Sequence, residues 1–135
     1  MKHSEFISVL SSLKAVENSV RILTLEGSKY IEGEIAYTTT YTLLSNAIPL
    51  QYFLKDFYNG GMSFDQMIIS ILAHIQKISD MLGEIYFNPW FEEQFVNDLI
   101  YKIGDTEGIL KKLLWKWEKE KEISRHQSSD PDIPF

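Results

Sequence analysis

The residues that most often bind metals or act as catalytic bases are scattered along this sequence. The three histidines are His3, His74 and His126, and no two of them have the spacing of metal ligands. Glu32 and Glu34 lie two residues apart, so a helix would point them to different faces, and neither belongs to a Glu-x-x-His motif for a pair of metal ions. We therefore expect no metal site and no cofactor, and we interpret His74 as a partly buried structural histidine.

The motifs of the common enzyme classes are missing as well. The chain has no cysteine, which excludes a disulfide framework, a thiolate metal site and a cysteine nucleophile, and which favours a cytoplasmic protein. No Gly-x-Ser-x-Gly motif occurs, and the glycines at 60–61 and 104–108 lack the lysine of a phosphate-binding loop. These glycines indicate helix breaks. We expect that the protein is not an enzyme.

The most specific pattern lies at the C-terminal end. After Glu122 the sequence is ISRHQSSDPDIPF, which has two prolines and no amphipathic period, so we expect an extended tail that can separate from the core. Its last six residues are Asp130, Pro131, Asp132, Ile133, Pro134 and Phe135.

This hexapeptide has the chemistry of a docking peptide. A terminal carboxylate can bind an arginine through two hydrogen bonds, the ring of Phe135 can fill an apolar pocket beside it, and Ile133 adds buried area. Asp130 and Asp132 would steer the tail towards a basic rim. Pro131 and Pro134 limit the unbound conformations of the tail and lower the entropy that is lost on binding.

The hexapeptide closely resembles the acidic tip at the C-terminus of bacterial single-stranded DNA-binding proteins. In that family a run of aspartates precedes Ile or Leu, then Pro, then a terminal Phe; here Pro131 stands where another aspartate is usual. The resemblance implies partners among the replication and repair proteins that bind this tip. It covers six residues only, and the rest of the chain lacks the five-stranded barrel pattern of the family, so its DNA-binding activity is not implied here.

A second candidate patch combines lysines with tryptophans near the end of the chain. Two tryptophans, Trp115 and Trp117, would point about 200° apart on a helix, so Trp117 can join the core while Trp115 is exposed. Cations beside an exposed ring are typical of single-stranded nucleic acid sites and of protein interfaces. In most such clusters, however, the rings belong to the hydrophobic core and the lysines are solvated surface charges. The candidate residues of this patch are Lys111, Lys112, Trp115, Lys116 and Lys119.

The charge balance argues against nucleic acid binding by the whole surface. Lys and Arg number 13 against 19 Asp and Glu, a net charge of −6, and without residues 123–135 the balance is 12 against 17, or −5. A binder that neutralises phosphates needs the opposite sign. We expect weak or no direct nucleic acid binding, and neither a signal peptide nor a membrane span is expected.

Two segments have apolar residues at alternating steps of three and four, the pattern of a helix with one buried face. The first lies between Ser4, a predicted N-cap, and Gly27, and buries Phe6, Val9, Leu13, Val16, Val20 and Leu23. The second starts at Ser63, which has capping-box spacing to Gln66, and buries Ile68, Ile71, Ile75, Ile78, Leu82 and Ile85.

The C-terminal third predicts two further helices. Asn88-Pro89 would open a helix that stops at Gly104, and Asp105 or Thr106 would cap the next one, which frays near Ser124. The expected buried residues are Phe91, Phe95, Leu99 and Ile103 in one, and Ile109, Leu110, Leu113, Leu114 and Trp117 in the other.

Residues 28–58 leave two interpretations open. Alternating apolar and polar residues with many threonines favour a strand over 31–42, which could pair with 20–25 as a hairpin. A helix would instead bury a stripe of Tyr37, Tyr41, Leu44 and Ile48, with Pro49 kinking or restarting it. We favour the helix, because an isolated hairpin is marginally stable unless it packs well on helices, and because the four other segments are clearly helical.

Together these patterns predict an all-α bundle of four to five helices over residues 1–122, with an extended acidic tail over 123–135. The alternative is an α+β fold with one hairpin at about 20–42.

For function, we expect an accessory or modulator protein of DNA replication, recombination or repair, of a kind that phages and mobile elements encode. It would bind, through its tail, the proteins that bind the tip of single-stranded DNA-binding proteins. The alternative function is a helical interaction module, of the inhibitor, immunity or assembly type, that acts on a basic partner. The apolar stripes could also join two protomers.

Overall fold

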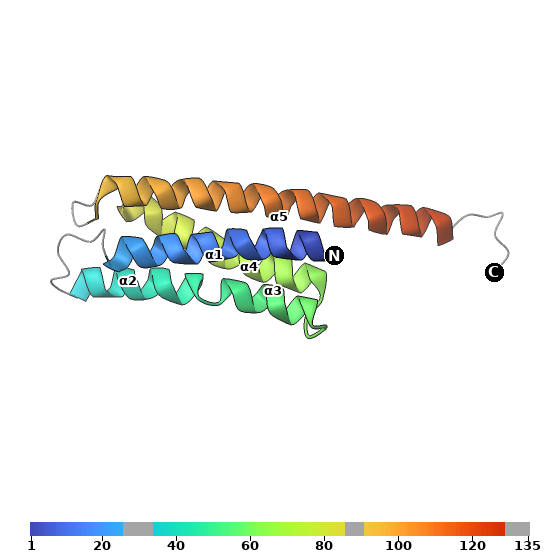
Figure 1. Cartoon of the computed structure of the whole chain (residues 1–135), viewed down its shortest axis with the longest axis horizontal. Coiled ribbons are helices and arrows are strands. Elements are labelled where there is room, and N and C mark those ends of the chain that lie inside the picture. Colours follow the sequence, from blue (N-terminus) through green and yellow to red (C-terminus); the bar gives the residue numbers. More distant parts are fainter. Residues whose placement is uncertain (26–33, 86–90, 129–135) are drawn as a thin grey trace.

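The computed structural model describes residues 1–25, 34–85 and 91–128, and this part of the chain is helical (Figure 1). It contains five helices and no strand: α1 (His3–Leu25), α2 (Glu34–Ala47), α3 (Leu50–Tyr58), α4 (Phe64–Ile85) and α5 (Glu93–Ser128). The prediction of an all-α bundle is confirmed. Within the described residues, no helix combines the length and the apolarity that a bilayer crossing requires.

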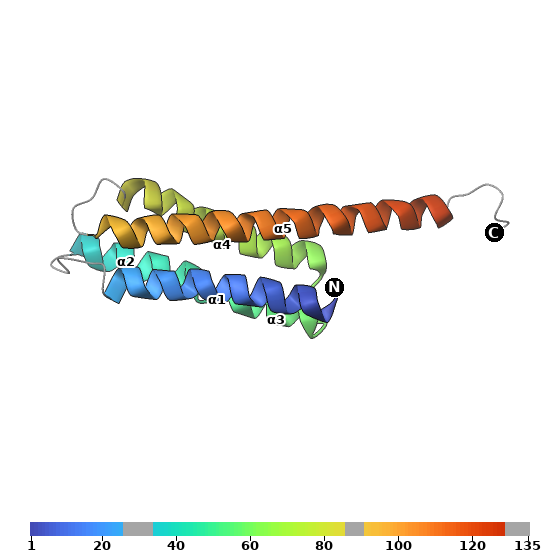
Figure 2. The ribbon, with the colours of Figure 1, turned by 45° about the horizontal axis from the view of Figure 1, so that its top comes forward.

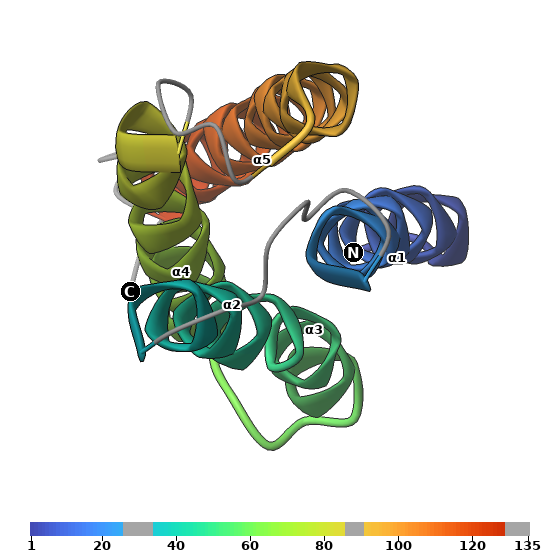
Figure 3. The ribbon, with the colours of Figure 1, turned by 90° about the vertical axis from the view of Figure 1, so that its left-hand side faces the viewer.

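The helices form an up-and-down bundle of four rods, in which α2 and α3 share one rod. The rod of α2 and α3 packs against α1 and α4, and α5 packs against the same two helices from the other side (Figure 3). Successive rods run in opposite directions, and α5 extends beyond the end of the bundle where α1 begins (Figures 1 and 2). The start of α1, the turn between α3 and α4, and the second half of α5 therefore meet at one end.

The stripes of α1 and α4 form the centre of the core as predicted. Every member of the α1 stripe from Val9 to Leu23 is buried, and Phe6 packs against the core from its edge. In α4 the stripe from Ile68 to Leu82 is buried in the same way, and Ser63 and Gln66 form the expected capping box, with each backbone N–H donating to the other's side chain over 3.2 Å. Ser4 is not a cap, because α1 already begins at His3.

The hairpin alternative at 20–42 is wrong for the described part of that segment. Residues 20–25 end α1 and residues 34–42 begin α2, while residues 26–33 between them lie outside the described residues. Residues 34–47 form a helix despite their local strand propensity, because the helix buries Leu43 and Ala47 completely against the other rods. Burial in the tertiary structure thus outweighs the weak preference of a threonine-rich stretch for a β-strand.

The buried face of α2 and α3 differs from the predicted stripe. Tyr41 and Ile48 are exposed, at 65% and 37%, and Leu44 is only partly buried. The buried residues are Leu43, Ala47, Leu50 and Leu54, whose steps of four, three and four continue across the break at Pro49. Pro49 precedes the first residue of α3, so the helix restarts there as expected while the buried face is maintained. Tyr41 was placed on the wrong face because the segment has two apolar stripes and the leucine and alanine stripe occupies the core; the side chain of Tyr37 lies outside the described part of the chain.

Helix α5 is one continuous helix where the sequence predicted two. It begins at Glu93 and passes through Gly104 and Gly108 without a break; Asn88 and Pro89 lie outside the described residues. A mid-helix glycine costs roughly 1 kcal/mol relative to alanine. The burial of Leu99, Ile103, Thr106 and Leu110 on the inner face of the same turns offsets that cost.

The predicted start of the tail at 123 is also corrected, since α5 continues to Ser128. The stretch from Glu118 to Glu122 alternates glutamate and lysine, which are good helix formers, and the first residue after it that is incompatible with a helix interior is Pro131. The last seven residues, 129–135, lie outside the described part of the chain.

Candidate functional site

The tail that carries the strongest sequence signal is not described by the structure. Asp130, Asp132, Ile133, Pro134 and Phe135 all lie beyond the last described residue, so their predicted role stays a prediction. What the structure does describe is the helix from which the tail departs.

Helix α5 carries the chain away from the bundle before the tail begins. Two contacts mark the end of its packing: the ring of Trp117 stacks on Phe64 at 4.4 Å between centroids, and Lys121 Nζ lies 3.6 Å from Asp65 Oδ2. The seven residues from Glu122 to Ser128 extend the helix by about 10 Å more. Figures 1 and 2 show this projecting end beyond the start of α1.

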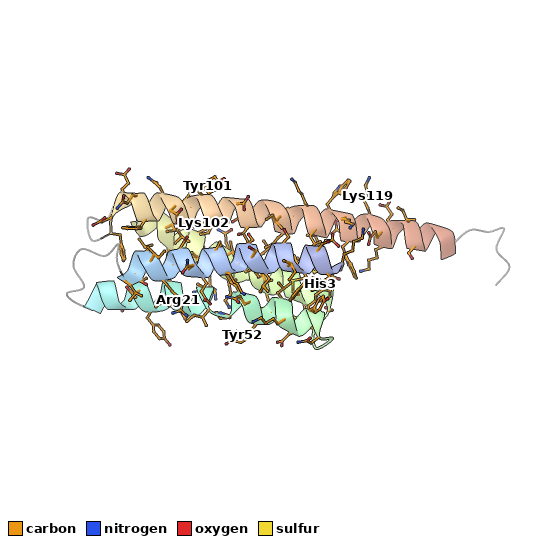
Figure 4. The ribbon with its side chains drawn as sticks, viewed as in Figure 1. His3, Arg21, Tyr52, Tyr101, Lys102 and Lys119 are labelled. Carbon is orange, nitrogen blue, oxygen red and sulfur yellow. The ribbon has the colours of Figure 1, made fainter. Side chains whose placement is uncertain are left out.

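The predicted lysine and tryptophan patch is partly brought together. Trp115 is 60% exposed, and Lys119 Nζ lies 4.4 Å from the centre of its ring in a cation–π contact. Lys111 lies one turn before Trp115 and is exposed, at 4.0 Å from Glu107. Lys119 lies beyond the start of α1 (Figure 4). Three of the five patch residues, Lys111, Trp115 and Lys119, thus form one stripe on the outer face of α5.

Lys116 does not belong to this stripe. Its Nζ donates a hydrogen bond to Glu5 Oε2 over 3.0 Å and ties α5 to α1. The backbone N–H of Lys2 and the ammonium of Lys116 lower the pKa of Glu5, and the hydrogen bond from Glu5 raises the pKa of Lys116. Lys112 is exposed and lies beside this pair, and it forms no ion pair with another described residue.

The two tryptophans have the opposite environments that their spacing predicted. Trp117 is partly buried against the core and stacks on Phe64, whereas Trp115 faces solvent. The buried Nε1 of Trp117 has no hydrogen-bond acceptor among the described residues.

Comparison of the chain with protein-family models, curated proteins and solved structures found no match.

Two of the histidines, His3 and His74, have structural partners. His74 is partly buried, hydrogen-bonds through Nδ1 to the carbonyl oxygen of Ser70 at 2.8 Å and lies 5.0 Å from the ring of Phe53. His3 Nδ1 lies 3.2 Å from the hydroxyl of Tyr58. Among the described residues, no three His, Asp or Glu side chains are grouped as metal ligands.

Polar contacts fix the seam between the antiparallel helices α1 and α5. Ser19 Oγ donates to Asp98 Oδ2 over 2.9 Å, Ser12 and Thr106 share a hydrogen bond of 2.5 Å, and Glu5 binds Lys116. Near the last of these contacts the seam opens into a groove of about 290 Å³, whose lining residues are Ser4, Glu5, Ser8, Val9, Ile109, Lys112, Leu113 and Lys116. A second hollow of about 270 Å³ continues it towards Trp117 and Glu120.

The structure also shows an aromatic face that the sequence reasoning missed. Tyr41, Ile48 and Tyr52 lie on the outer side of α2 and α3 and are 65%, 37% and 62% exposed. Aromatic side chains are enriched at protein interfaces. The signal that could have found them is the alternative stripe of Leu43, Ala47, Leu50 and Leu54, which places the tyrosines outside.

Proposed function

We propose that this protein is a non-enzymatic accessory or modulator of DNA replication, recombination or repair that docks onto partners of single-stranded DNA-binding proteins through its tail. The sequence DPDIPF carries the proposal. The projecting end of α5 supports it, because it separates the attachment point of the tail from the packed bundle by about 10 Å of helix.

The binding chemistry follows from the residue types of the tail. The carboxylate of Phe135, taken as free, would form a charge-assisted pair with an arginine of the partner, and its ring would fill an apolar pocket next to that arginine. Ile133 and Pro134 would extend the apolar contact, while Asp130 and Asp132 would raise the rate of encounter with a basic rim.

The body would present the tail and contribute little affinity for DNA. Its net charge of −5 without residues 123–135 opposes phosphate binding, and Lys116 is already held by Glu5. Such a protein would work in the cytoplasm and could be encoded by a phage or mobile element.

A pull-down from bacterial lysate tests the proposal directly. The bait is the full chain, compared with a chain that lacks residues 130–135 and with a control in which the same six residues are scrambled. Loss of the same replication and repair proteins from both variants supports the proposal. An unchanged list of captured proteins would overturn it.

The second candidate is a helical interaction module that binds a partner through the bundle itself. The observation that favours it is the exposed face with Tyr41, Ile48 and Tyr52. The same pull-down separates the two, because substitution of Tyr41 and Tyr52 by serine would remove the partners of a bundle surface and leave the partners of the tail in place.

A further inference from the structure

The groove on the seam between α1 and α5 has an apolar floor and a basic rim. Ile109 and Leu113 contribute partly buried apolar side chains to it, Lys112 brings an ammonium group that is unpaired among the described residues, and Lys116 brings one that is paired with Glu5. Glu5 is the acidic residue among its lining residues, so these charges sum to +1 on a chain of net charge −6. A groove of this kind suits an acidic peptide with apolar side chains.

The groove has the length of a short extended peptide. It shares Glu5, Leu113 and Lys116 with the neighbouring hollow, and the two together run from Ile109 to Glu120. These eleven helical steps span about 16 Å, which equals five extended residue steps. Trp117, whose buried Nε1 lacks an acceptor among the described residues, lines the far half.

We propose that this groove binds residues 130–135 of a second copy of the chain. The hexapeptide is about 16 Å long when extended. Its aspartates and the carboxylate of Phe135 would face Lys112, which forms no ion pair with another described residue, and its Ile133 and Phe135 side chains would cover Ile109 and Leu113.

The tail of the same molecule is too short for this role. Lys112 lies sixteen residues before Ser128 in α5, or about 24 Å along the helix. The seven residues 129–135 reach at most about 24 Å when fully stretched. A tail attached at Ser128 therefore cannot turn back and place Phe135 beside Lys112, so a hexapeptide that fills the whole groove comes from another molecule. Two copies can exchange tails reciprocally, which gives a closed dimer.

Tail exchange would regulate the proposed function, and this consequence rests on that function. A tail that lies in a groove cannot bind another protein, so partner proteins would compete with self-association. The protein would release its tail as it is diluted or as a partner accumulates.

Sedimentation velocity over a range of concentrations tests the exchange with the full chain. We expect a monomer–dimer equilibrium that deletion of Phe135 or Lys112→Glu weakens at least tenfold. Lys77→Glu, the same charge change at an exposed site on α4, is the control and should leave the equilibrium unchanged. A chain that stays monomeric at every concentration, or a dimer that is insensitive to both changes, would overturn the proposal.

Complementation provides the sharper test. One chain carries Lys112→Glu and keeps its tail, while another carries Asp130→Lys and Asp132→Lys and keeps its groove. Each alone should fail to dimerise, whereas an equimolar mixture should form a heterodimer, because it restores one native pairing of tail and groove and reverses the charges of the other. No heterodimer in the mixture would overturn the exchange.

The failure of this inference can be distinguished from failure of the proposed function. A labelled peptide of residues 129–135 is titrated separately against the full chain and against a purified tip-binding protein. Binding to the tip-binding protein alone overturns the exchange and supports the function, and binding to the chain alone does the reverse.

Discussion

Helix α5 has two parts with different surroundings. From Phe95 to Trp117 one face of the helix packs into the bundle, with Leu99 and Leu110 completely buried. From Glu118 to Ser124 every described side chain is exposed, and Ile123 is 57% accessible although it is apolar. The two parts share one continuous backbone, but the first has an apolar face that packs into the bundle, and the second is mostly lysine and glutamate.

This difference separates stability from binding. Helix that packs on other rods is stabilised by burial, whereas an unpacked helical end contributes little to the free energy of unfolding. Changes in the first part should therefore lower the melting temperature. Changes in the second part, and in the tail beyond it, should alter binding and leave the melting temperature unchanged.

The largest effect is expected for a cavity in the packed part. Leu99→Ala removes a fully buried side chain and should lower the free energy of unfolding by about 3 kcal/mol. Ile123→Ala is the matched change in the projecting part and should alter it by less than about 0.5 kcal/mol. Urea unfolding followed by circular dichroism measures both. A similar loss in the two variants would show that the projecting end is packed against something in solution.

Deletion of Phe135 should produce the second largest effect, and on binding alone. The ring and the carboxylate act as one anchor, so the loss is on the order of 3 kcal/mol, or at least about a hundredfold in affinity for a tip-binding protein. Fluorescence anisotropy of labelled tail peptides gives the affinity, and thermal melts of the full chain, at concentrations where it is monomeric, give the control. A fall in melting temperature would instead make the tail part of the fold.

Two matched changes separate the parts of this anchor. One glycine added after Phe135 keeps the ring but moves the carboxylate, and should be nearly as damaging as the deletion. Asp130→Asn should weaken binding less and mainly reduce its salt dependence, because a rim charge steers more than it anchors. Equal effects of the two changes would contradict the anchor model.

A smaller effect of opposite sign is expected in the packed part of α5. Gly108→Ala should raise the free energy of unfolding by about 1 kcal/mol, since the glycine is helical, exposed and has open space where a Cβ would be. Gly60→Ala is the contrasting control, because Gly60 has a φ of +86° that disfavours a side chain, and it should be destabilising. Chemical denaturation measures both variants. A stabilised Gly60→Ala would contradict the backbone argument.

The same glycines show how far the sequence could predict the fold. Helices α1 and α4 were predictable because each has one uninterrupted stripe, and a single helical orientation buries all of it. Gly104 and Gly108 were read as breaks because local propensity was the only guide there, whereas the buried neighbours Leu99, Ile103 and Leu110 maintain the helix. The face of α2 was misjudged because Tyr41 and Leu43 belong to competing stripes, and only the packed rods decide between them.

The candidate site was predictable in its residue types but only in part in its geometry. The opposite orientations of Trp115 and Trp117 follow from helical angles, and the structure confirms them. The assignment of Lys116 to the exposed patch could not be corrected from the sequence, because its partner Glu5 lies 111 residues away in the chain. Contacts across such a separation depend on the register of two helices, which no local pattern specifies.

The smallest effect tests that contact between Glu5 and Lys116. The pKa of Glu5 is lowered, so the carboxylate stabilises the fold above the ordinary glutamate value of about 4.3, and this contribution is lost as the pH falls through the lowered value. The pKa of Lys116 is raised, so its contribution is complete below about 10.4 and is lost as the pH rises further.

A double-mutant cycle with Glu5→Gln and Lys116→Gln, measured by urea unfolding, should give a small favourable coupling at pH 7 that disappears at pH 2.5. The pair of Arg21 and Glu17 lies within one helix, is about as exposed and is longer, at 3.5 Å, so it is the reference cycle and should show a weaker coupling at pH 7. Equal coupling in both cycles would mean that the seam pair contributes no more than a surface pair, and that the packed part of α5 is held to α1 by its apolar contacts and by the serine and threonine hydrogen bonds.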